Sequence, residues 1–156
     1  MLLIAAAGGI SLVERPDISD IEPSPTKMIS YTLLALVVFV IAGVGVSALP
    51  QSLTVLKNLS TTDQGVFGAL MAISEEFFFR GFVTGWLYQR QGYIFSIFGS
   101  SAVFTAYHLL VYGVSANLIY VFVAGVVLAY VFLKTGSLVP DTLAHIINNL
   151  VATGVI

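Results

Sequence analysis

The sequence predicts an all-α, polytopic membrane protein, a helical bundle with about five to six transmembrane helices. Composition is the first reason: 58% of the 156 residues are hydrophobic and 9% are charged, whereas soluble domains carry about 25% charged residues. This small number of polar side chains cannot cover a surface that faces water. We therefore expect the surface of the protein to face the lipid bilayer. The protein should therefore be an integral, multi-pass membrane protein.

The second reason is a series of apolar runs, because a helix needs about 20 such residues to cross a bilayer. The runs that reach or approach this length are 29–49, 65–87, 93–112, 117–133 and 140–155. The run 1–13 is shorter, and we interpret it as the end of a helix that begins before this chain. The polar segments 14–27 and 50–64 are predicted loops, and Ser60 is a suitable N-cap for the helix that follows.

The distribution of charged residues also limits which partners and which membrane topology we expect. The six Lys and Arg residues are scattered, so nucleic acid is not an expected partner. If the helices alternate in direction, one side of the membrane receives most of the loop cations, namely Arg15, Lys27, Arg90 and Lys134. The other side receives only Lys57. The positive-inside rule then places the loops 14–27, 89–92 and 134–139 in the cytoplasm.

Two adjacent glutamates, Glu75 and Glu76, interrupt the apolar run 65–87. Each charge at mid-bilayer costs about 2.5–3.5 kcal/mol on the insertion scale, so such residues usually mark function. At about 100° per residue, Arg80 lies about 40° from Glu76 but about 140° from Glu75. We therefore expect Glu76 to pair with Arg80 along one helix face, and Glu75 to point elsewhere. The alternative is that both acids belong to a structural ion-pair network.

The only two histidines of the chain lie in other predicted helices. Phe104 and His108 are four residues apart, as are His145 and Asn149, so each pair shares a helix face. One histidine alone could simply hydrogen-bond across a helix interface. Three membrane helices that each place Glu, His or Asn within the bilayer instead predict a shared cavity, because such groups need one another or water.

Together these residues form three motifs, E-E-x-x-x-R at 75–80, F-x-x-x-H at 104–108 and H-x-x-x-N at 145–149. In this order the chain resembles the CPBP family of type II CAAX prenyl endopeptidases and bacteriocin-processing or immunity membrane proteins. The resemblance covers about residues 66–156, the expected catalytic helical core, whereas 1–65 would supply N-terminal membrane helices and polar loops. The chain is shorter than is usual for the family and ends directly after the third motif.

The resemblance implies a glutamate-dependent intramembrane endopeptidase whose substrate is a membrane-associated protein or peptide, with or without a prenyl group. Glu75 would be the general base and His108 its partner, with His145 and Asn149 as oxyanion donors. The supporting positions would be Glu76, Arg80 and Phe104. These residue types suit peptide hydrolysis, which needs a base for water and fixed donors for the developing negative charge. The short chain favours a prokaryotic relative, and hence a prokaryotic plasma membrane.

Three other interpretations stay open. Glu and His are zinc ligands, but the sequence has no H-E-x-x-H motif, so we expect neither a metal nor another cofactor. A transporter or proton relay would also place Glu and His in the membrane, although no internal repeat supports it. A non-catalytic scaffold or a bacteriocin self-immunity protein is the main alternative, and a glutamate mutant that keeps full function would favour it. The sequence leaves the oligomeric state open.

Overall fold

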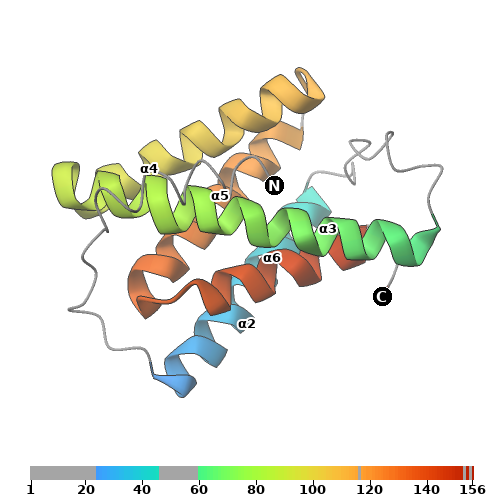
Figure 1. Cartoon of the computed structure of the whole chain (residues 1–156), viewed down its shortest axis with the longest axis horizontal. Coiled ribbons are helices and arrows are strands. Elements are labelled where there is room, and N and C mark those ends of the chain that lie inside the picture. Colours follow the sequence, from blue (N-terminus) through green and yellow to red (C-terminus); the bar gives the residue numbers. More distant parts are fainter. Residues whose placement is uncertain (1–23, 46–59, 116, 153, 155) are drawn as a thin grey trace.

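The computed structural model describes residues 24–45, 60–115, 117–152, 154 and 156. Every regular element in these ranges is helical, which confirms the all-α prediction for the described part of the chain. The elements in order are α2 (Pro25–Gly45), α3 (Thr61–Glu76), the π-helical segment η2 (Phe77–Thr84), α4 (Gly85–Tyr112), α5 (Asn117–Thr135) and α6 (Leu138–Ala152) (Figure 1). The predicted helix at 1–13 and the loop cation Lys57 lie outside the described residues.

One long helix carries the glutamates. It begins at Ser60, whose side chain accepts a hydrogen bond from the backbone N–H of Asp63 as predicted for an N-cap. It then runs through α3, η2 and the first residues of α4 without interruption (Figure 1). The first non-helical residue is Gly92 (φ 79°), a left-handed conformation that glycine adopts at no steric cost. The predicted turn at 89–92 is therefore wrong in length, because the chain reverses at a single glycine.

Three helices of the described residues are long and apolar enough to cross a membrane, namely Pro25–Ala42, Thr61–Leu110 and Asn117–Thr135. This number is lower than the five to six predicted, for two physical reasons. The second stretch counts once although Gly92 bends it, and α6 has 15 residues, fewer than the about 20 that a span needs.

The distribution of side chains is that of a lipid-embedded protein. Large apolar side chains of α2 point outwards, with Val40 and Ile41 each 67% exposed. Serines are buried instead: the Ser100 and Ser101 hydroxyls both donate to the backbone carbonyl of Ile97. Small hydroxyl residues inside and aliphatic residues outside are typical of helix packing in membranes. Together with the spans, this arrangement supports an integral membrane protein.

Contacts between helix ends show which loops share one end of the bundle. The Lys134 ammonium lies 5.2 Å from the ring centre of Tyr93, so the end of α5 adjoins the bend at Gly92. The Thr32 hydroxyl, near the start of α2, donates to the Pro140 carbonyl near the start of α6 at 3.4 Å. The loops at 89–92 and 134–139 and the beginning of α2 thus lie at one end of the bundle, as expected if the helices alternate in direction. That this end faces the cytoplasm stays a prediction.

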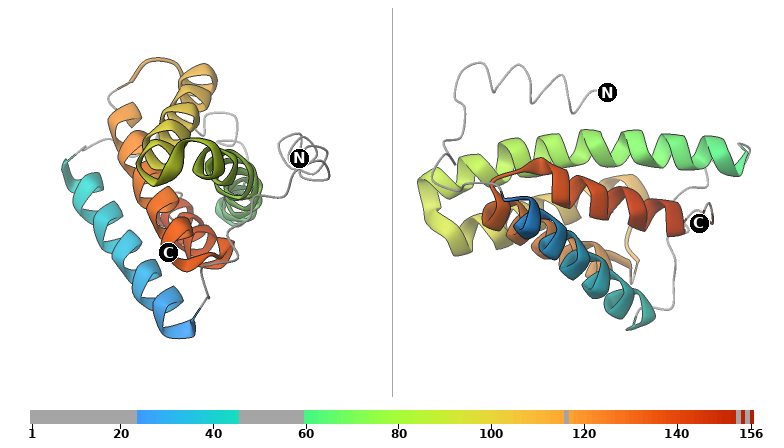
Figure 2. Two further views of the ribbon diagram at one scale, coloured as in Figure 1. Left: turned by 90° about the vertical axis from the view of Figure 1, so that its left-hand side faces the viewer. Right: turned by 90° about the horizontal axis from the view of Figure 1, so that it is seen from below.

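The last helix holds the central position for the site. α6 packs against α2, α3 and α5, and Figure 2 shows it beside the long helix formed by α3 and η2. α4 packs against α5 so closely that a Cβ at Gly125 would lie 3.2 Å from the Ser101 Cα. The fold therefore places the histidine helix, α6, against the glutamate helix, α3.

Candidate active site

The two adjacent glutamates have different surroundings. Both are buried, with Glu75 4% and Glu76 0% exposed. Glu75 lines a cavity of about 140 Å³ that is partly open to the outside, whereas Glu76 lies outside its lining. A Glu76 carboxylate oxygen, Oε2, lies 3.0 Å from the Arg80 Nε, so the pair that the spacing predicted is present. One glutamate therefore faces a cavity and the other is paired with a cation.

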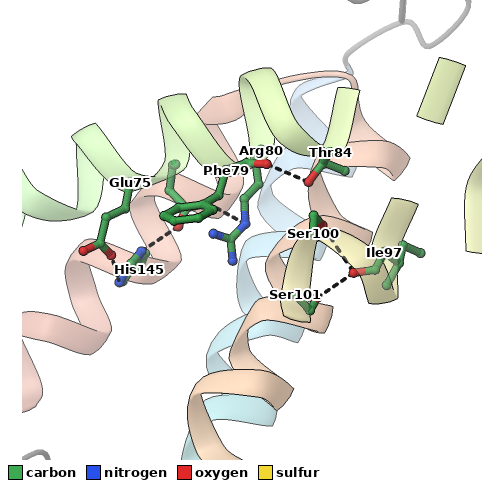
Figure 3. A network of polar contacts seen from close by, with 9 residues as sticks. Glu75, Phe79, Arg80, Thr84, Ile97, Ser100, Ser101 and His145 are labelled. Carbon is green, nitrogen blue, oxygen red and sulfur yellow. Dashed lines mark hydrogen bonds and ion pairs between the residues drawn. The ribbon is translucent and has the colours of Figure 1, made fainter. Parts of the chain in front are cut away.

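His145 lies between the two carboxylates. Its Nδ1 is 2.6 Å from Glu76 Oε1, and its Nε2 is 3.8 Å from Glu75 Oε2. Figure 3 shows the Glu75 and His145 side chains facing each other from α3 and α6. Because an ionised carboxylate only accepts hydrogen bonds, the Nδ1–H donates to Glu76. Glu76 thus fixes the orientation of the imidazole, and the Nε2 edge is turned towards Glu75.

His108 is held by its own helix. Its Nδ1 lies 2.9 Å from the Phe104 carbonyl oxygen, which can only accept, so this nitrogen carries a hydrogen. The rings of Phe104 and His108 have their centres 4.3 Å apart. The Arg80 guanidinium carbon lies 4.3 Å from the centre of the Phe104 ring, a cation–π contact. The Phe104 ring therefore contacts both the Arg80 guanidinium and the His108 imidazole.

Asn149 fixes the other end of the α3–α6 contact. Its side-chain Nδ2 donates to the Gly68 carbonyl oxygen at 3.1 Å. A Cβ at Gly68 would lie 3.6 Å from the Asn149 Cβ, so the two helices approach closely at this point. Asn149 is thereby held on the same side of α6 as His145, which lies one turn earlier.

The cavity brings together five of the residues that the sequence singled out: Glu75, Phe104, His108, His145 and Asn149. Glu76 and Arg80 are buried outside it and support its wall. The other lining side chains are largely apolar and come from α2, α3 and α5, among them Phe39, Phe67, Met71, Val121 and Leu128. The site is thus a small polar centre within a mainly apolar wall, which suits a substrate with apolar side chains.

Sequence reasoning missed two groups near the site. Tyr120 donates a hydrogen bond to the Asn148 side-chain oxygen, and both residues line the cavity. Asp141 is fully buried and interacts electrostatically with Glu76 and Arg80. Asp141 could have been found by extending the i,i+4 series of His145 and Asn149 by one turn towards the N-terminus. Nothing in the sequence indicates the Tyr120–Asn148 contact, because it joins two helices.

The π-helical segment is a further feature without a sequence signal. η2 follows Glu76 directly and contains Arg80. Within it the Thr84 hydroxyl donates to the Phe79 carbonyl five residues earlier, at 2.8 Å (Figure 3). Short π-helical stretches inside α-helices occur frequently at functional sites. Here the wider turn lies between the glutamates and the rest of the long helix.

A metal would need several ligands in one place. Among the described residues, no group of three His, Asp or Glu side chains is arranged to hold a metal ion. The absence of a metal requirement stays a prediction, which a chelator can test.

Comparison with known proteins adds the family. A family model described as "Type II CAAX prenyl endopeptidase Rce1-like" matches residues 59–151, more than half of the 156. The chain belongs to this family. The matched range contains all three motifs, and the family is one of proteases, so a lipid environment and a protein or peptide substrate follow. A search of curated proteins and a search of solved structures each returned no match.

Proposed function

We propose that the protein is a multi-pass intramembrane endopeptidase that hydrolyses a peptide bond in a membrane-associated protein or peptide, with Glu75 as general base. One observation carries this proposal: Glu75, His108, His145 and Asn149, from three helices, line the same cavity. Peptide hydrolysis needs a base, water and oxyanion donors in one place.

Glu75 and His108 would activate the water. The Glu75 carboxylate takes one proton from the water, whose oxygen attacks the carbonyl carbon of the scissile bond. The His108 Nδ1 carries a hydrogen because it donates to the Phe104 carbonyl, so in the neutral ring the Nε2 is an acceptor. This nitrogen can accept the second hydrogen of the water and orient its oxygen.

His145 and Asn149 would stabilise the oxyanion of the tetrahedral intermediate. The His145 Nδ1–H is used by Glu76, so the donor to the oxyanion is the Nε2. That nitrogen donates only when the ring carries both hydrogens, so this step requires the doubly protonated ring. The intermediate then collapses: the C–N bond breaks, and Glu75 returns its proton to the leaving amine nitrogen.

The apolar wall of the cavity supports a substrate that reaches the site from the membrane. We extend the proposal to a prokaryotic plasma membrane, and to prenylated as well as unprenylated peptides. A library of quenched membrane peptides in liposomes, each peptide made with and without a farnesyl group, separates the two substrate kinds.

The experiment compares the wild-type protein with Glu75→Gln, with and without a chelator. Asp63→Asn is the matched control, because Asp63 is an exposed acid at the start of the same long helix. We expect cleavage that survives the chelator, is lost in Glu75→Gln and is unchanged in Asp63→Asn. Cleavage that is lost with the chelator would show a metalloprotease. No cleavage by folded wild-type protein would favour the scaffold or immunity alternative.

A further inference from the structure

We propose that Asn117 and Asn148 form a second binding subsite of the cavity, which holds the backbone of an extended peptide about three residues from the bond that is cleaved. Asn148 donates to a carbonyl oxygen of the peptide, and Asn117 accepts from an N–H of the same peptide residue. The position relative to the cleaved bond rests on the proposed function, whereas binding of a peptide backbone does not. Neither asparagine is one of the residues that define the three motifs.

The cavity has room for more than a catalytic water. Its volume of about 140 Å³ far exceeds the about 10–15 Å³ that one water needs. On α3 its lining runs from Phe67 to Glu75, about two turns of helix. On α5 the lining runs from Asn117 to Leu128, about three turns. The cavity is therefore elongated along the helices, and Glu75 lies at one end of its α3 side.

The asparagine end of the cavity lies about 10 Å from Glu75 along α3. Asn149, the neighbour of Asn148, donates to the Gly68 carbonyl of α3. Gly68 precedes Glu75 by seven residues, and a helix rises about 1.5 Å per residue. An extended peptide covers the same distance with about three residues, at about 3.3 Å each. One peptide can therefore contact both ends of the cavity.

Tyr120 fixes the orientation of the Asn148 side chain. The Tyr120 hydroxyl donates to the Asn148 Oδ1, and its ring lies against Phe39 of α2, with the ring centres 6.3 Å apart. Within the described part of the chain, the Asn148 Nδ2 forms no hydrogen bond. Because the oxygen of this amide is used by Tyr120, the side chain has two N–H donors left for a group in the cavity that it lines.

Asn117 provides the complementary acceptor. It lies three residues before Tyr120, so the two side chains are neighbours on one face of α5. At the start of a helix an asparagine oxygen usually accepts a hydrogen bond from a backbone N–H. The Asn117 Oδ1 is instead buried without a hydrogen-bond partner among the described residues, so capping does not account for it. A buried acceptor is costly unless a ligand or water pairs with it.

The two side chains together fit a peptide backbone. In an extended chain the N–H and the C=O of one residue point to the same side, as in the hydrogen-bonded pairs of an antiparallel sheet. Asn148 supplies the donor for this carbonyl, and Asn117 supplies the acceptor for this N–H. The wall around them is apolar, with Phe39, Val121 and Ala124, and would otherwise leave these backbone groups unpaired. The subsite therefore recognises the backbone rather than a particular side chain.

The first test measures binding without cleavage. The sequence has four asparagines, so protein with ¹⁵N in its asparagine side chains gives few NH₂ signals, and Asn117→Asp and Asn148→Asp assign two of them. The protein carries Glu75→Gln to prevent cleavage and is titrated in bicelles with the blocked tetrapeptide acetyl-Leu-Ala-Leu-Ala-methylamide. We expect both assigned signals to shift. The Asn117 signal should shift much less with the all-ester analogue, which keeps the side chains but has no N–H.

An added asparagine serves as the control in this titration. Asp63→Asn places a fifth asparagine at an exposed position near the start of α3. Its signal should not respond to the tetrapeptide, because it lies outside the cavity. Asparagine signals of the cavity that do not move would overturn the proposal. Equal shifts of the Asn117 signal with the tetrapeptide and with its ester analogue would overturn it as well.

The second test applies once a cleaved peptide is known, and it replaces each non-scissile amide in turn by an ester. We expect the ester about three residues from the cleaved bond to lower kcat/KM of wild-type protein about 2- to 10-fold, mainly through KM, which is the range of one hydrogen bond. The same ester should have no effect in Asn117→Leu, and Asn117→Ser serves if that variant fails to fold. An ester effect that persists unchanged in the folded Asn117 variant would contradict the proposal.

The two tests separate this proposal from the proposed function. If wild-type protein cleaves no peptide while both asparagine signals respond to the tetrapeptide, the proposed function fails and the peptide-binding subsite stands. If peptides are cleaved but no ester position depends on Asn117, the proposed function stands and the subsite is refuted.

Discussion

Replacing Glu76 by glutamine should mainly reduce stability, whereas replacing Glu75 by glutamine should mainly reduce activity. Glu76 is 0% exposed, forms an ion pair with Arg80 and accepts a hydrogen bond from His145. In Glu76→Gln the guanidinium loses the carboxylate paired with it, and the new amide N–H₂ faces a donor. Breaking a buried ion pair costs about 3–5 kcal/mol in soluble proteins. Hydrogen bonds in membranes average about 0.6 kcal/mol, so we expect the lower end, about 3 kcal/mol of unfolding free energy.

Glu75→Gln should cost much less stability. The contact of Glu75 with His145 spans 3.8 Å, beyond hydrogen-bond distance, and its side chain faces the cavity. We expect a loss of about 1 kcal/mol or less, the range of one ordinary hydrogen bond. The loss of activity should be larger in Glu75→Gln than in Glu76→Gln, because only Glu75 is proposed to contact the water.

Unfolding by SDS in mixed micelles measures the two losses. Trp86 is the only tryptophan of the chain, so its fluorescence reports the transition without further labelling. A difference of about 2 kcal/mol between the two variants is a factor of about 30 in the ratio of folded to unfolded protein. Asp63→Asn is the control for the loss of an exposed acid and should lose no more than about 1 kcal/mol, because Asp63 lies in the first turn of the helix and accepts a hydrogen bond from the Ser60 hydroxyl at 2.7 Å. Equal losses in Glu75→Gln and Glu76→Gln would refute the assignment of different roles to the two acids.

Other predictions concern packing, the cavity wall and metal. Gly125→Val should destabilise the fold by about 1–3 kcal/mol in the same SDS assay, since the Cβ alone would lie 3.1 Å from the Ser101 Cβ and 3.2 Å from its Cα; a wild-type midpoint would contradict the close α4–α5 contact. Tyr120→Phe removes the donor to Asn148 and should cost about 1 kcal/mol, and an unchanged midpoint would argue against that hydrogen bond. Dialysis against a chelator should leave both the midpoint and peptide cleavage unchanged, and restoration of lost activity by zinc would overturn this expectation.

Local spacing predicted those parts of the site that lie on one helix. The four-residue interval between Glu76 and Arg80 predicted their ion pair, and the same interval placed His145 and Asn149 on one face. Convergence of the three helices on one cavity followed from the cost of polar groups in lipid, and the structure brings these residues together. The catalytic roles stay proposals.

Contacts between helices and departures from regular geometry could not be predicted. The sequence favours α2 from residue 29, whereas the helix begins at Pro25, because proline is well tolerated in a first helical turn and the polar residues there extend the helix beyond its apolar part. The π-helical turn of η2 depends on packing. The burial of Asp141 follows from the docking of α6 on α3, which no single segment of sequence records.

The most direct test of the account is the single-turnover rate at which Glu75→Gln, reconstituted in liposomes, cleaves the best peptide of the library. We predict a rate about 10²–10⁴-fold below that of the wild-type protein, the usual contribution of a general base, with the midpoint of SDS unfolding nearly unchanged. A folded Glu75→Gln protein that cleaves at the wild-type rate would contradict the assignment of Glu75 as the base.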